Sequence, residues 1–208
     1  MVISKSLKEQ IEQQLFSAEL VRIPASEEEY FSVAQALPFK IEYHENEIIT
    51  IGLATPWHEI VIMNFGRIFG NIFLEEADML VLGNNTGVKI PKFEGGYYMP
   101  DVLVMKGEPV FSEKSNCIIT NPYIIVEVLS PVTKAFDLSE KLPEYKLLES
   151  LQRVIYVNPN KVSVSSFTRS KNQNGWLNQD FYELQDVLVV AGVPIVVSDI
   201  YRKIKFEN

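Results

Sequence analysis

Hydrophobic and polar positions recur along the chain with two different periods. Residues 4–20 carry apolar side chains at helical spacing, which predicts a first helix. Ser26 followed by Glu29 forms the pattern of a capping box, so we predict a short second helix that ends at Ala36. Between positions 39 and 51 apolar and polar residues alternate on either side of His44-Glu45-Asn46, which predicts two strands joined by a tight turn.

A long helix is predicted to begin at Thr55-Pro56. Threonine is a favoured N-cap, and proline is well tolerated at the first helical position. One apolar face then recurs at helical spacing down to Ile72, and we expect Trp57 and the phenylalanines of this face to be ordinary core residues.

For the rest of the chain the pattern predicts short strands interrupted by a few helical turns. Strands are predicted at 79–82, 87–90, 99–105, 123–129 and 153–157, with a helical stretch at 139–150. Segments 161–168 and 176–184 form a predicted hairpin closed by Asn174-Gly175, and 197–206 a last helix. This order predicts a mixed sheet flanked by helices, in the α/β or α+β class. We expect residues 1–25 to form a poorly anchored helical arm and residues 26–208 to form a single domain.

Composition narrows the class of protein. Of the 208 residues 47% are hydrophobic, which is enough for a proper core. We find neither a run of apolar residues long enough for a membrane helix nor an apolar signal-peptide core. With Cys117 as the single cysteine, an intrachain disulfide is impossible, and with two histidines a His/Cys zinc site is not expected. The simplest interpretation is a cytoplasmic protein.

The formal net charge is −8, and no basic patch is evident along the sequence. Proteins that coat nucleic acid usually carry a basic surface, because binding releases counterions from the phosphates. The charge therefore argues mildly against such a protein. It does not exclude a metal-dependent nuclease, whose cation-binding carboxylates count as negative.

Glu127 interrupts the apolar segment Tyr123-Ile-Ile-Val-Glu-Val-Leu129, which is typical of a strand covered on both faces. A lone carboxylate in such a place is costly unless it is paired, protonated or bound to a cation. Either Glu127 forms a salt bridge with a neighbouring Lys or Arg, or it belongs to a functional site.

Asp101 shows the same anomaly at the start of the apolar strand that begins with Val102. An Asp after a Pro is often only a turn residue. However, adjacent strands would bring Asp101 and Glu127 within reach of one Mg²⁺, which favours one or two carboxylates plus other oxygen ligands. The backbone carbonyl of Val128 is a candidate for a further ligand.

Lys141 is the third candidate. A helix after the Glu127 strand could carry it back over the two acids, where it would orient a water or offset charge that develops on a phosphate. Alternatively, Lys141 is an ordinary surface lysine beside Glu140 and Glu144.

Three motifs together resemble the Uma-two family of the PD-(D/E)xK nuclease superfamily. They are Met99-Pro-Asp-Val-Leu-Val-Met105, Asn121-Pro-Tyr-Ile-Ile-Val-Glu-Val-Leu-Ser-Pro131, and Asp137-Leu-Ser-Glu-Lys141 with Tyr145. The resemblance covers about residues 28–200 and implies a restriction-endonuclease-like core. It also implies a metal-dependent phosphodiesterase site that contains Asp101, Glu127 and Lys141.

Two departures from the superfamily pattern concern the lysine. In the superfamily the lysine usually lies two residues after the strand acid, where this chain has Leu129. The resemblance therefore implies that Lys141 takes the role of that lysine. Pro143 follows soon after, and proline breaks the hydrogen bonding of a helix interior. The helix either starts near Glu140 or is kinked there.

Glu47 and His58 are supporting candidates. The superfamily often uses an additional early carboxylate for the metal, and Glu47 is the best match in the predicted hairpin; alternatively, it is an exposed acid at a strand end. His58 stands where the family often has a histidine, and would contact phosphate or act as a local capping group.

The expected function is that of a Mg²⁺- or Mn²⁺-dependent endonuclease acting on nucleic acid, with DNA as the expected substrate. By analogy with other nucleases, a homodimer would supply two sites for cutting two strands. Two alternatives stay open: a noncatalytic oligomeric module with a remnant of the nuclease fold, which the net charge favours slightly, and a hydrolase of small phosphoesters.

Overall fold

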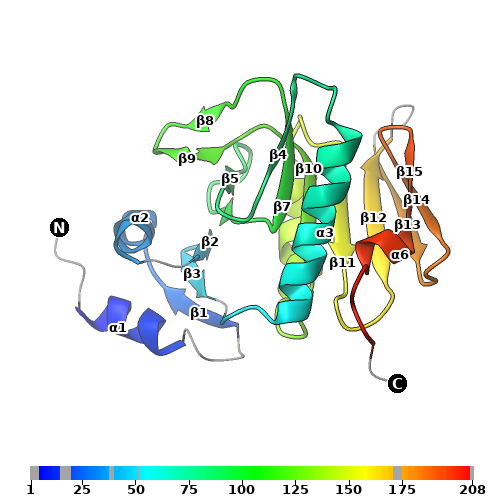
Figure 1. Ribbon diagram of the computed structural model, residues 1–208. Helices are drawn as coiled ribbons and strands as arrows, with labels where there is room; N and C mark the ends of the chain where they lie inside the picture. The colour runs from blue at the N-terminus through cyan, green and yellow to red at the C-terminus, as the bar shows by residue number, and fades with distance from the viewer. Residues whose placement is uncertain (1–4, 15–19, 38–39, 51, 171–174, 207–208) are drawn as a thin grey trace.

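The structure is a computed structural model that describes residues 5–14, 20–37, 40–50, 52–170 and 175–206. It contains large mixed sheets flanked by helices, as the sequence predicts (Figure 1). Within the described residues no helix is long and apolar enough to cross a lipid bilayer.

A six-stranded sheet forms the centre of the fold, with β10 in its interior. β10 pairs antiparallel with β7 and parallel with β11, which makes the sheet mixed. In spatial order the strands are β13 (Trp176–Phe181), β12 (Val164–Arg169), β11 (Arg153–Val157), β10 (Pro122–Val128), β7 (Val102–Lys106) and β4 (Met79–Leu82).

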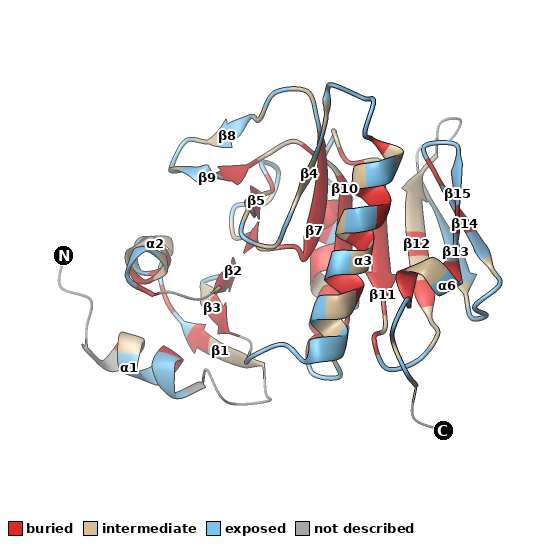
Figure 2. Cartoon of the chain, in the orientation of Figure 1, coloured by how far each residue is buried: buried red, intermediate tan, exposed pale blue. Residues whose placement is uncertain are grey.

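Each face of this sheet is covered. Helix α3 (Pro56–Ile72), the longest among the described residues, packs on one face together with α6 (Val197–Ile200) and the hairpin of β14 (Val187–Val190) and β15 (Val193–Val196). The other face is covered by a helical segment made of α4 (Lys134–Phe136), the π-helix η1 (Asp137–Lys141) and α5 (Leu142–Tyr145). Because both faces are covered, β7, β10 and β11 are almost wholly buried (Figure 2), which explains their continuous apolar runs.

A seven-stranded sheet combines strands from the N-terminal part of the chain with strands from its middle. Helices α1 (Lys5–Gln14) and α2 (Glu27–Ala36) pack against it, and Leu7 and Ile11 of α1 are buried there. In spatial order the strands are β1 (Val21–Pro24), β3 (Glu47–Thr50), β2 (Glu42–His44), β6 (Tyr97–Tyr98), β5 (Gly87–Lys89), β9 (Ser115–Ile119) and β8 (Phe111–Ser112). β1 lies inside the segment predicted as a helical arm, so this segment contains a strand that the periodicity did not reveal.

Local signals in the sequence predicted several boundaries well. Ser26 and Glu29 form the reciprocal capping box at the start of α2. Thr55 caps α3 by accepting a hydrogen bond from the backbone N–H of His58 at 3.3 Å. Glu45 and Asn46 adopt φ of 47° and 67°, the left-handed values that a two-residue hairpin turn requires.

Two predictions fail in part, and one is tested only in part. Trp57 is 39% exposed, so it is not a core residue. The last helix ends at Ile200, since Tyr201 is its C-cap. The hairpin of β12 and β13 is confirmed, but its turn at Asn174, like positions 15–19, 39 and 51 of the predicted helix and strands, lies outside the described residues.

The helical stretch around Lys141 begins earlier than predicted, at Lys134. Pro143 sits just inside α5, directly after the π-helical turn, where the N–H of Leu142 donates to the carbonyl of Asp137. π-Turns interrupt the regular hydrogen-bond ladder. We infer that this interruption accommodates a proline, which has no N–H to donate.

Candidate active site

The pairing of β7 with β10 brings Asp101 and Glu127 together. The register places Val102 opposite Val126, so Asp101, which precedes β7, lies beside the end of β10. Its Oδ2 accepts a hydrogen bond from the backbone N–H of Val128 at 2.8 Å. Both acids line one cavity of about 1100 Å³. Two acids that are 26 positions apart in the sequence therefore face the same space.

Glu127 is buried and held by two donors. The hydroxyl of Tyr145 donates to its Oε1 at 2.7 Å, and the ammonium of Lys141 lies 3.5 Å from the same oxygen. Burial raises the pKa of Glu127 to about 8; Lys141 opposes this shift, whereas the negative charges of neighbouring acids add to it. Near neutral pH this carboxyl therefore carries a proton for much of the time.

Lys141 is the centre of a buried charge cluster. Its Nζ lies 2.8 Å from Glu42 Oε2, 3.1 Å from Asp137 Oδ1 and 3.5 Å from Glu127 Oε1. Burial lowers the pKa of Lys141, but the surrounding carboxylates outweigh it and raise the pKa well above the usual value. Lys141 is therefore a permanent cation, and the alternative of an ordinary surface lysine is wrong.

Asp101 has a different environment. His58 Nε2 lies 3.4 Å from its Oδ2, and Lys40 Nζ lies 3.8 Å from its Oδ1. Burial raises the pKa of Asp101, but His58, Lys40 and the N–H of Val128 together outweigh it, so that the pKa falls below its usual value. The pKa of His58 is raised in turn, because Asp101 outweighs the effect of burial. The pKa shifts of the two acids thus have opposite directions: that of Asp101 is lowered and that of Glu127 is raised.

Two acids of the early hairpin, Glu42 and Glu47, occupy different places. Glu42, on β2, contacts Lys141 and accepts a hydrogen bond from the N–H of Met99 at 2.8 Å. Glu47 is 31% exposed and pairs with Arg22 at 3.1 Å, away from the residues that line the cavity. Its supporting role stays a prediction.

Sequence reasoning missed Glu42. Strict alternation with Ile41 and Tyr43 made it look like a solvent-facing residue, but β2 is buried on both faces. The available signal was its neighbour on the same face, His44, because two polar residues on one face of an interior strand suggest a buried polar cluster.

The donor set suits a hard divalent cation. Mg²⁺ takes oxygen ligands and needs only one or two carboxylates from the protein. Asp101 and Glu127 meet this need, and Val128, whose carbonyl was predicted as a ligand, lines the same cavity. Among the described residues no three His, Cys, Asp or Glu side chains converge on one metal position, so waters and substrate oxygens would have to complete the coordination.

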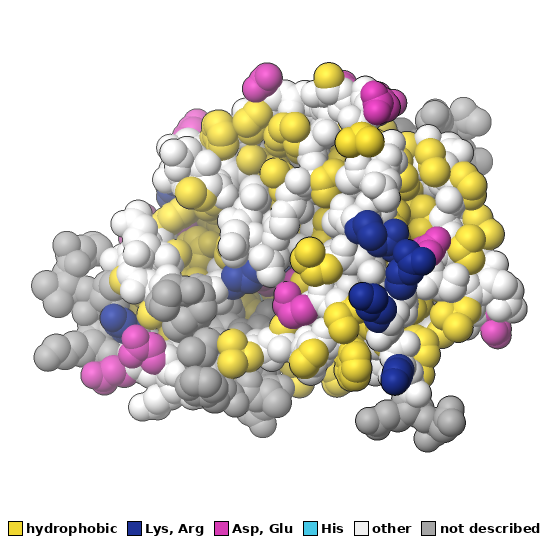
Figure 3. Space-filling view, in the orientation of Figure 1, with side chains coloured by type: hydrophobic (Ala, Val, Ile, Leu, Met, Phe, Trp, Pro, Cys, Tyr) yellow, Lys and Arg dark blue, Asp and Glu magenta, His cyan; other side chains and the backbone are white. Residues whose placement is uncertain are grey.

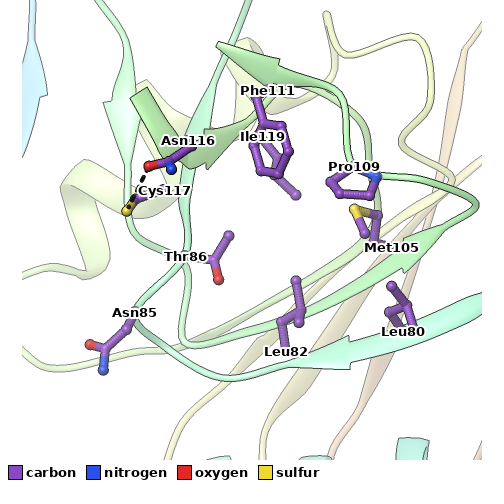
Figure 4. A pocket seen from close by; sticks show the side chains of 10 residues that line it. All are labelled: Leu80, Leu82, Asn85, Thr86, Met105, Pro109, Phe111, Asn116, Cys117 and Ile119. Atoms are coloured by element: carbon purple, nitrogen blue, oxygen red, sulfur yellow. Dashed lines mark hydrogen bonds between the residues drawn. The ribbon is translucent and has the colours of Figure 1, made fainter. Parts of the chain in front are cut away.

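A second cavity, of about 320 Å³, lies between β4, β7 and the hairpin of β8 and β9 (Figure 4). Its lining is mostly apolar, and Cys117 there donates a weak hydrogen bond to Asn116 Oδ1 at 3.6 Å. Among the described residues that line it there is no carboxylate, lysine or histidine. The lining residues are Leu80, Leu82, Asn85, Thr86, Met105, Pro109, Phe111, Asn116, Cys117 and Ile119.

Comparison with known proteins identifies the family of the chain. The Uma2 family model, described as "Putative restriction endonuclease", matches residues 27–200. The chain belongs to the Uma2 family. This match contains Asp101, Glu127, Lys141 and both supporting candidates.

Relatives and a solved structure extend the comparison. Two proteins of Synechocystis sp., both described as uncharacterized, are similar to the chain. The protein slr1290 is 29% identical over 87% of this chain and 93% of its own length. The protein sll1609 is 28% identical over 62% of this chain and 72% of its own length. A crystal structure described as a putative nuclease belonging to DUF820, from Anabaena variabilis, matches with a TM-score of 0.64. It covers 82% of this chain and 96% of its own at 15% identity, so it supports the fold of this Uma2 protein.

Proposed function

We propose that this Uma2 protein is a metal-dependent endonuclease that hydrolyses phosphodiester bonds in nucleic acid, with DNA as the substrate. The observation that carries the proposal is the convergence of Asp101, Glu127 and Lys141 on one cavity. Strongly shifted pKa values in a cavity are typical of catalytic groups. The same three residues are those that the PD-(D/E)xK resemblance implies.

Asp101, Glu127 and the carbonyl of Val128 would hold Mg²⁺ or Mn²⁺. When bound, such a cation stabilises negative charge on phosphate oxygens and lowers the pKa of water. Asp101 is already ionised and is held in place by the N–H of Val128. Glu127 must release its proton to become a ligand, and the hydroxyl of Tyr145 keeps its carboxyl oriented.

Lys141 would act on the charge of the reacting phosphate. Its ammonium cannot leave the cavity wall easily, because Glu42 and Asp137 hold it from two sides. A fixed cation there stabilises a transition state more effectively than a mobile one, since no reorganisation is needed during the reaction. His58, beside Asp101, would support the site by holding that carboxylate and by contacting substrate phosphate.

The proposal is tested by incubating the purified protein with single-stranded DNA, duplex DNA and RNA, with Mg²⁺, Mn²⁺ or EDTA. We expect divalent-dependent cleavage that Asp101→Asn and Glu127→Gln each reduce by at least about a hundredfold. The matched controls are Asp78→Asn and Glu149→Gln, which remove equivalent charges from exposed positions.

Cleavage that persists in EDTA or in both site variants would contradict the proposal. Association of two copies for double-strand cleavage stays a prediction, which sedimentation of the purified protein would test.

A further inference from the structure

Basic side chains gather on one face of the molecule, over α3 and α6 (Figure 3). This basic track consists of Arg67, Lys161, Arg202, Lys203 and Lys205, all exposed. Among the described residues none of the five forms an ion pair with a carboxylate. In a chain of net charge −8 this is an unusual local concentration of unpaired positive charge.

The fold holds these side chains outward. After α6, Tyr201, Ile204 and Phe206 pack against the main hydrophobic core, so the cations between them face solvent. Lys203 adopts φ of 69°, a left-handed value that favours glycine or asparagine. The chain therefore presents a lysine here despite a backbone conformation that disfavours it.

Hydrogen bonds tie the separate parts of the basic track together. The guanidinium of Arg67 donates to the carbonyl of Asp199 at 3.2 Å, and the amide of Asn64 donates to that of Arg202 at 2.9 Å. The hydroxyl of Tyr201 donates to the carbonyl of Lys161 at 3.2 Å. α3, α6 and the loop after β11 are thus held as one surface.

The basic track reaches the rim of the candidate active site. Pro159 and Asn160 line the large cavity, and Lys161 follows them directly in the chain. His58, near the start of α3, also lines the cavity, and Arg67 is nine residues further along the helix. A helix rises 1.5 Å per residue, so the two are separated by about 14 Å along its axis.

We propose that the basic track binds the phosphate backbone of duplex nucleic acid beside the bond that is cleaved. In this arrangement the scissile phosphate lies beside His58 and the duplex runs along α3. Duplex DNA advances about 3.4 Å per base pair, so about 14 Å then corresponds to roughly four base pairs from the scissile phosphate. Contacts of this kind position the duplex without reading its sequence. The proposal deepens the proposed nuclease function and rests on it, because it assigns to the track the part of the substrate that is not cut.

The test measures binding without cleavage. A fluorescent 30-base-pair duplex is titrated with the protein in EDTA over a series of salt concentrations. The first variant combines Arg202→Gln, Lys203→Gln and Lys205→Gln, and the second combines Arg67→Gln with Lys161→Gln. The control combines Lys8→Gln, Lys92→Gln and Lys106→Gln, which removes the same charge as the first variant from surface lysines elsewhere.

We expect the first variant to bind the duplex more weakly, with a plot of log affinity against log salt that is shallower by about 2.7, since each lost phosphate contact contributes about 0.9. For the second variant the slope should be shallower by about 1.8, and the control should have the affinity and the slope of the wild type. Equal binding by the wild type and both variants would overturn the proposal.

A parallel arm uses lipid vesicles that contain phosphatidylserine. Binding to these vesicles that depends on the track, without binding to the duplex, would assign the surface to a membrane and overturn the proposal. Track-dependent duplex binding by a protein that never cleaves would support the track while contradicting the proposed nuclease activity.

Discussion

The ammonium of Lys141 lies 3.5 Å from Oε1 of Glu127, although the two residues are on different elements and 14 positions apart. The position two residues after Glu127, where the superfamily usually has its lysine, is filled by Leu129, which packs in the core. Lys141 is the last residue of the π-helical turn, which lies in the helical layer that covers one face of the sheet. In this chain an acid and a lysine are thus brought together by tertiary structure and not by their places along one strand.

Replacing Lys141 by methionine should abolish cleavage and destabilise the protein. The change leaves three buried acids without their cation, a situation that costs about 3 to 5 kcal/mol. The loss of stability should be smaller at pH 5 than at pH 8, because at pH 5 protonation of the buried acids removes part of the repulsion between them. Urea unfolding at both pH values measures it, with Lys134→Met, at an exposed lysine of the same helical segment, as the control. Equal stability of wild type and Lys141→Met at pH 8 would contradict the assigned pairing.

The stability of the metal-free protein should fall between about pH 5 and pH 8. The pKa of Glu127 is raised to about 8 by burial, so folding favours its protonated form. The stability from this group is complete below its unfolded pKa, near 4.5, and is lost as the pH rises toward 8, by at most about 1.4 kcal/mol per pH unit. Glu144, whose pKa burial raises to about 7, adds in the same direction. Thermal melts across this range should show a shallower loss for Glu127→Gln, and identical slopes would refute the assignment.

Divalent cations should reverse this pH dependence. A bound cation favours the ionised forms of Asp101 and Glu127, so its binding releases the proton of Glu127 and tightens as the pH rises toward 8. At about a hundred times the dissociation constant, Mg²⁺ or Mn²⁺ should stabilise the fold by roughly 2.7 kcal/mol. Asp101→Asn should lose most of this gain, whereas Asp78→Asn should keep it. A wild-type protein whose melting temperature does not respond to either ion would argue against the metal site.

Elements with strong local signals could be predicted from the sequence, and elements that depend on distant pairing could not. The capping box at Ser26 and the Thr55-Pro56 helix start depend on neighbouring residues alone, and both are confirmed. Strands β6 and β8 contain only two residues each and owe their existence to their partners. The hairpin of β14 and β15 was missed, and the helix predicted after it was drawn too long, because apolar residues there fit either period.

The functional residues also divide into those visible in the local sequence and those that depend on tertiary structure. Asp101 and Glu127 were visible because an acid stands out in an apolar strand. The basic track was invisible because Arg67, Lys161 and the cations after Tyr201 come from three distant parts of the chain, so net charge gave no hint of it. Among the hairpin acids the sequence pointed to Glu47 and missed Glu42, because burial of a hairpin residue depends on which elements cover the hairpin.

The last prediction ranks these two acids. Glu42 is buried and touches Lys141 at 2.8 Å, whereas Glu47 is partly exposed and pairs with Arg22. Glu42→Gln should therefore reduce cleavage by at least about a hundredfold, because it frees the ammonium that offsets phosphate charge. Glu47→Gln removes the same charge from the same hairpin but breaks only a half-exposed pair, which contributes at most about 1 kcal/mol. Cleavage rates of the two variants under identical Mg²⁺ concentrations measure the difference. If Glu47→Gln abolished cleavage while Glu42→Gln kept it, the early acid predicted from the sequence would be the functional one, and the Glu42–Lys141 contact would be structural.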